Sequence, residues 1–110
     1  MKPVKFYNSY ECYDDNFKED EVVAILNTQT NRLGIDMTTE CKNYKTAINR
    51  MFRVLLKDIR ILELINVKDL YEDIIESCKS GYFKISSKEF SYEIYNLDNG
   101  LHYVNVMMEL

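Results

Sequence analysis

The chain has 110 residues, 46% of them hydrophobic and 29% charged, and a formal net charge of −4. These values are typical of one folded domain over residues 1–110 rather than a disordered chain, and the length leaves no room for a second core. Because the longest apolar run, Val22–Leu26, is too short to span a membrane and Met1–Lys5 lacks a hydrophobic signal region, we expect a cytoplasmic protein.

The N-terminal part of the chain predicts three strands. Val4–Tyr13 alternates apolar and polar residues and is followed by an acidic loop, Asp14–Glu21. Two further segments, Val22–Thr28 and Arg32–Thr39, then predict a β-hairpin.

The parity of the apolar residues predicts the register of this hairpin. A three-residue loop over 29–31 pairs Ile25 with Ile35 on one face, whereas a two- or four-residue loop sends them to opposite faces. Asn31 then takes the last loop position, where a left-handed backbone is usual and Asn tolerates it.

Two helical segments are predicted next. Thr39–Ile65 has a wide apolar stripe at helical spacing, formed by Tyr44, Ile48, Met51, Phe52, Leu55, Ile59 and Leu62. The second segment begins at the N-cap Asn66, which is followed three residues later by Asp69, and it ends at Gly81.

A second hairpin is predicted at the C-terminal end, between Phe90–Leu97 and Leu101–Leu110. A type I turn with Gly100 in the left-handed conformation gives a three-residue loop. That loop pairs Ile94 with Val104 on one face.

Together with a short strand at 82–85, the predicted order is β-ββ-αα-(β)ββ. Strands that are segregated from helices indicate an α+β fold. We therefore expect two layers: an antiparallel sheet of about five strands, and two helices packed on one face of it.

Cys12, Cys41 and Cys78 have no CxxC spacing, so we expect reduced thiols rather than a disulfide framework. The three cysteines and His102 could meet as zinc ligands, but no local pair of ligands indicates such a site. The spacing supplies His102 with neither an orienting acid nor a nucleophile, so we interpret it as structural. We expect no metal, cofactor or catalytic residue.

The segment Leu33–Asp36 resembles the strand that carries the first catalytic Asp of ribonuclease H-like and actin-like folds. The resemblance implies metal-dependent catalysis by Asp36. However, neither a Gly-rich phosphate loop nor a second matching acidic strand follows it in the sequence. We therefore interpret Asp36 as a surface residue.

Basic residues follow the apolar stripe of the first helical segment and fall in an adjoining sector. Such a face could follow a phosphate backbone, bind an acidic protein, or be solvated. The candidate nucleic-acid-binding residues are Lys45, Arg50, Arg53, Lys57 and Arg60.

The chain has nine tyrosines and no tryptophan, and several tyrosines have the parity opposite to the apolar residues of their strands. If helices cover one face of the sheet, these rings lie on the other, and Tyr is enriched at interface hot spots. The predicted partner-binding residues are Tyr7, Tyr13, Tyr95, Tyr103, Glu93, Asp14 and Asp15.

The sequence has no P-loop, nucleophile elbow or clustered ligands, which favours a binding protein over an enzyme. We predict a small protein-binding module that inhibits or modulates a host macromolecule. The abundance of Lys, Asn, Ile and Tyr implies an AT-rich gene, which would suit a phage- or plasmid-encoded anti-defence protein. The alternatives are a nucleic-acid-binding protein that uses the basic helix face, and a homodimeric accessory protein.

Overall fold

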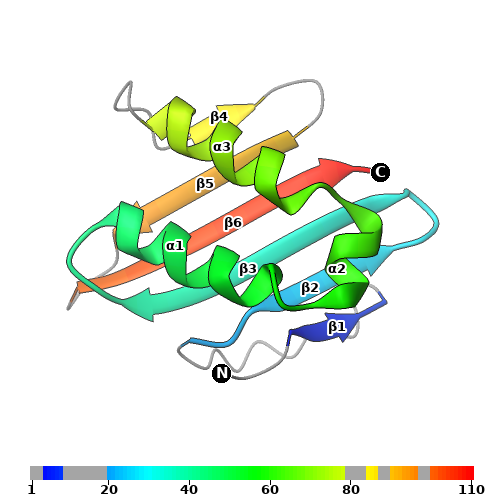
Figure 1. Cartoon of the computed structure of the whole chain (residues 1–110), viewed down its shortest axis with the longest axis horizontal. Helices are drawn as coiled ribbons and strands as arrows, with labels where there is room; N and C mark the ends of the chain where they lie inside the picture. Colours follow the sequence, from blue (N-terminus) through cyan, green and yellow to red (C-terminus); the bar gives the residue numbers. More distant parts are fainter. Residues whose placement is uncertain (1–3, 9–19, 79–83, 87–89, 97–99) are drawn as a thin grey trace.

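A computed structural model of the chain describes residues 4–8, 20–78, 84–86, 90–96 and 100–110. The elements in chain order are β1 (Lys5–Tyr7), β2 (Val23–Asn27), β3 (Arg32–Glu40), α1 (Tyr44–Leu55), α2 (Ile59–Leu64), α3 (Val67–Cys78), β4 (Lys84–Ser86), β5 (Phe90–Asn96) and β6 (Leu101–Glu109). Figure 1 shows all three helices on the same side of one sheet, so the fold is α+β with two layers.

The described residues form one sheet of six strands in the order β1-β2-β3-β6-β5-β4. β1 runs parallel to β2, and the other neighbouring pairs are antiparallel. The α+β class is confirmed, but the prediction of about five strands in an all-antiparallel sheet was wrong. A parallel pair needs a connection of about a dozen residues or more, and the interval 8–22 between β1 and β2 is long enough.

The register of the C-terminal hairpin is confirmed. Ile94 pairs with Val104, and Tyr95 pairs with Tyr103. Gly100 has a φ of 78°, in the left-handed region that the predicted bulged turn requires.

The register of the N-terminal hairpin was predicted wrongly. Ile25 pairs with Gly34 rather than Ile35, so the loop has four residues, 28–31. The side chain of Asn27 holds this loop, because its Oδ1 accepts hydrogen bonds from the backbone N–H of residues 29 and 30 at 3.0 and 3.2 Å. Ile25 consequently lies on the face of the sheet away from the helices, where it is only 2% exposed.

The first predicted helical segment is divided in the structure. β3 continues to Glu40, and α1 ends at Leu55. The chain then forms a tight turn, in which the N–H of Asp58 donates to the carbonyl of Leu55 at 3.1 Å. Asp58 is the N-cap of α2, since its Oδ1 accepts from the N–H groups of Arg60 and Ile61 at 3.0 and 3.3 Å.

The predicted start of the last helix is confirmed, because Asn66 Oδ1 accepts from the N–H of Asp69 at 3.1 Å. The helices cover the sheet through one hydrophobic core. Its fully buried members include Leu33, Ile35 and Val106 from the sheet, and Ile48, Met51, Phe52, Leu55, Ile61 and Ile74 from the helices.

Candidate functional site

Large apolar side chains are exposed mainly at one place on the helical layer. Among the described residues, the exposed large hydrophobic side chains are Leu56, Ile59, Leu62, Leu64 and Leu110. The first four lie on α2 or in the turn before it, and we refer to them as the α2 surface. Contiguous exposed apolar residues of this kind mark contact sites more often than the scattered single ones that every protein carries.

The break before α2 explains this exposure. A continuous helix would place Ile59 and Leu62 on the buried stripe, as the sequence pattern predicted. After the break, Ile61 faces the core with 0% exposure, so its neighbours turn outward and Ile59 is 69% exposed. The prediction that Ile59 and Leu62 belong to the core was therefore wrong.

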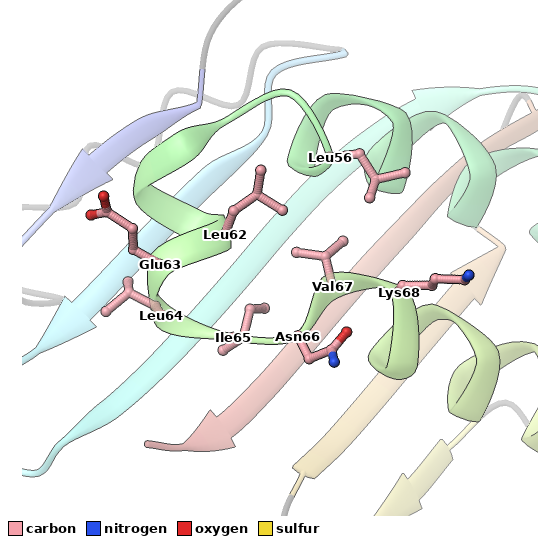
Figure 2. A pocket seen from close by; sticks show the side chains of 8 residues that line it. All are labelled: Leu56, Leu62, Glu63, Leu64, Ile65, Asn66, Val67 and Lys68. Atoms are coloured by element: carbon pink, nitrogen blue, oxygen red, sulfur yellow. The ribbon is translucent and has the colours of Figure 1, made fainter.

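A pocket with a volume of about 420 Å³ lies beside the α2 surface. Its lining residues are Leu56, Leu62, Glu63, Leu64, Ile65, Asn66, Val67 and Lys68. Figure 2 shows that Leu56, Leu62 and Val67 come from three successive segments and gather around the same hollow. The pocket is therefore an open hollow whose lining combines apolar side chains with about as much polar surface.

Three exposed cations accompany this pocket. Lys68 lines it, Lys57 follows Leu56 in the chain, and Arg53 lies one helical turn earlier. None of the three takes part in an ion pair that the structure shows between described residues.

The other candidate nucleic-acid-binding cations do not form one continuous stripe with them. Arg60 Nη2 lies 2.8 Å from Asp58 Oδ2, and its guanidinium stacks over the Phe6 ring at 4.2 Å. In the middle of α1, Arg50 donates to Thr39 Oγ1 at 2.8 Å and to the carbonyl of residue 40 at 2.6 Å. Lys45 is exposed near the start of α1.

The described residues include only part of the predicted tyrosine surface. The registers place Tyr7 and Tyr103 on the face away from the helices, as predicted, but both side chains are half-buried. In β5, the backbone of Tyr95 and Glu93 is placed, while their side chains lie outside what the structure describes. Residues 13–15, which include the predicted Tyr13, Asp14 and Asp15, also lie outside it.

Asp36 is buried on that same face, with 8% exposure, so its interpretation as a surface residue was wrong. β3 is a central strand, and its residues on both faces are covered. Burial raises the pKa of the Asp36 carboxyl, and hydrogen bonds from Asn105 and Tyr103 offset part of that effect.

Cys41 and His102, whose pairing the sequence left open, lie next to each other, with Sγ 3.5 Å from Nδ1. Nδ1 is also 3.1 Å from the carbonyl of Gly100, which can only accept a hydrogen bond, so Nδ1 carries the imidazole proton. Nδ1 therefore cannot take the thiol proton, and the thiol itself donates to the Asn43 carbonyl at 3.2 Å. This arrangement joins the β3–α1 connection to β6, and it supports a structural role.

No group of three or more His, Cys, Asp or Glu side chains in the described part of the chain is placed to hold a metal ion. None of the described helices combines the length and the apolar character needed to cross a membrane. A comparison of the chain with protein-family models, curated proteins and solved structures found no match. The fold and its surfaces therefore identify only a structural class, a two-layer α+β domain with an exposed apolar surface on its helical layer.

Proposed function

We propose that this protein is a protein-binding module and that the α2 surface is its principal contact. One observation carries the proposal: four large apolar side chains are exposed on α2 and the turn before it, and three of them, Leu56, Leu62 and Leu64, line one pocket. Leaving such surface in water forgoes about 25 cal/mol for each Å² that could be buried, and a partner recovers that free energy.

Inhibition or modulation of a host macromolecule in the cytoplasm remains the role we favour. It requires only that the α2 surface occupy a site on another protein, with no chemistry by this chain. Arg50 and Arg60 are engaged within the molecule, which leaves fewer free cations for a phosphate backbone than a continuous stripe would offer.

The experiment compares tagged wild-type protein with two variants in affinity capture from the source cells. Ile59→Asp with Leu62→Asp introduces two negative charges into the α2 surface. Lys42→Gln with Lys45→Gln makes the same change in net charge at exposed residues at the other end of α1, as a matched control. We expect the same partner with wild type and control, and its loss in the α2 variant, while circular dichroism shows all three folded.

Two results would move the contact elsewhere. A partner that survives the α2 changes but is lost with Tyr7→Ala would place the contact on the face away from the helices. Tight binding of a labelled oligonucleotide by the wild type at low salt, lost in Lys45→Glu with Arg53→Glu, would favour the nucleic-acid alternative.

A further inference from the structure

We propose that the occupant of the α2 pocket is an acidic amphipathic helix of the partner protein. This inference rests on the proposed function and adds the shape and charge of what binds there.

The size of the pocket fits apolar anchors from one face of a helix. A volume of about 420 Å³ has room for roughly two or three leucine-sized side chains. Residues three or four positions apart on a helix lie on the same face, so one helix can place such a set into one pocket. Leu56, Leu62 and Val67 supply the complementary apolar walls.

The sheet offers a poorer site for an added strand. Its edge strands β1 and β4 have three residues each, which gives few backbone groups for pairing. Lys5 and Lys84 begin these two strands, and lysines on edges discourage pairing with another chain. A helix bound on the helical layer needs no free edge.

Charge decides between an acidic and a basic helix. The chain as a whole is acidic, at −4, yet Arg53, Lys57 and Lys68 stand exposed around Leu56 and the pocket. The nearby acids are Glu63 on the rim, Glu72 one helical turn after Lys68, and Asp69 in the first turn of α3, where the positive end of the helix dipole offsets its charge. Three cations therefore face two acids whose charge is not offset. An acidic helix therefore meets net attraction, and a basic helix meets repulsion.

The test uses three labelled synthetic peptides and fluorescence anisotropy with the full chain. Two share one helical leucine stripe, with Glu on the polar face of the first and Lys on that of the second. The third has the composition of the acidic peptide with its leucines scrambled. We expect the acidic amphipathic peptide to bind at least tenfold more tightly than either of the others, and added salt to weaken its binding.

Matched charge reversals locate the binding. Arg53→Glu with Lys68→Glu should weaken the acidic peptide about tenfold, because each exposed charge contributes a factor of a few. Lys42→Glu with Lys45→Glu makes the same change in net charge at the other end of α1 and should leave its affinity within about twofold. Ile59→Asp with Leu62→Asp should abolish its binding.

Each other outcome overturns the inference. Equal affinity for the acidic and basic amphipathic peptides, lost in the α2 variant, removes the acidic partner but leaves the α2 surface as the contact. Equal binding of the scrambled peptide, or no binding of any peptide, removes the amphipathic helix. The proposed function is tested separately, by whether the Ile59→Asp, Leu62→Asp variant still captures the partner from the source cells.

Discussion

The carboxylate of Asp36 lies in the middle of the sheet, between β2 and β6, where Asn105 and Tyr103 donate hydrogen bonds to it. A carboxylate in such a place keeps some hydrogen-bonding partners but loses its hydration. Alternation along β3 placed Asp36 on the polar parity, and that parity is correct. Its burial could not be predicted, because nothing in the local pattern shows that both faces of β3 are covered.

Replacing Asp36 with Asn should make stability less dependent on pH. Because the pKa of Asp36 is raised on folding, its contribution is fully present below the unfolded pKa and is lost as pH rises through the folded pKa. At neutral pH the variant should gain stability, on the order of 1 kcal/mol. Urea unfolding of wild type and variant at acidic and neutral pH measures this.

The control is Asp73→Asn, which changes an exposed acid on α3. If the stability difference between wild type and Asp36→Asn is the same at both pH values, the buried carboxylate does not carry the effect.

At the scale of elements, the turns and caps with distinctive side chains were predictable, and the interruption of a helix was not. Gly100 and Asn66 have conformational or capping preferences that can be read locally. The apolar spacing from Tyr44 continued past Leu56, so periodicity alone indicated one helix. Asp58, a good N-cap residue, was the available signal for a new helix start.

The orientation of α2 can be tested by two alanine substitutions within its first turn, at Ile59 and Ile61. Ile61→Ala removes a fully buried side chain and should cost about 2–4 kcal/mol. Ile59→Ala should change stability by less than about 0.5 kcal/mol, because that side chain is exposed. Chemical denaturation gives both values. A larger loss for Ile59→Ala than for Ile61→Ala would indicate that the helix continues through Asp58, because a continuous helix would bury Ile59.

Asp58 caps α2 and pairs with Arg60, and the hydrogen bond from Arg60 is the main cause that lowers the pKa of Asp58. Asp58→Ala should therefore destabilise the protein by about 1 kcal/mol at neutral pH. Asp58→Asn keeps the cap and should cost less. The contribution of the charge is present above the unfolded pKa and is lost as pH falls through the folded pKa.

Thermal unfolding of the three proteins at two pH values gives this comparison. If the wild type is more stable than Asp58→Asn by the same amount at both pH values, the Asp58–Arg60 ion pair does not cause the difference.

At the scale of the whole molecule, Arg60 connects the helical layer to the edge of the sheet. Its Nη2 donates to the carbonyl of Val4 at 2.8 Å, and its guanidinium covers Phe6. The two-layer arrangement was predictable from the order of strands and helices. This connection was not, because it joins residues 56 positions apart and depends on the turn before α2.

Arg60→Ala should loosen β1 without unfolding the domain. Hydrogen exchange of the β1 amides, including the Lys5 N–H that donates to Val22, should become about tenfold faster. Amides of β3, in the centre of the sheet, should be unchanged. Equal acceleration in both strands would mean that Arg60 supports the domain as a whole.

The pairing of β3 with β6 has a consequence for biosynthesis. Asp36 and its partner Asn105 are separated by 69 positions, so a nascent chain that has emerged only as far as α3 exposes one whole side of β3. That incomplete chain carries a nine-residue strand with one apolar face and unpaired backbone groups along one edge, which is the kind of segment that aggregates or recruits chaperones. Ribosome-bound intermediates of this protein should therefore be more vulnerable to aggregation than the finished fold.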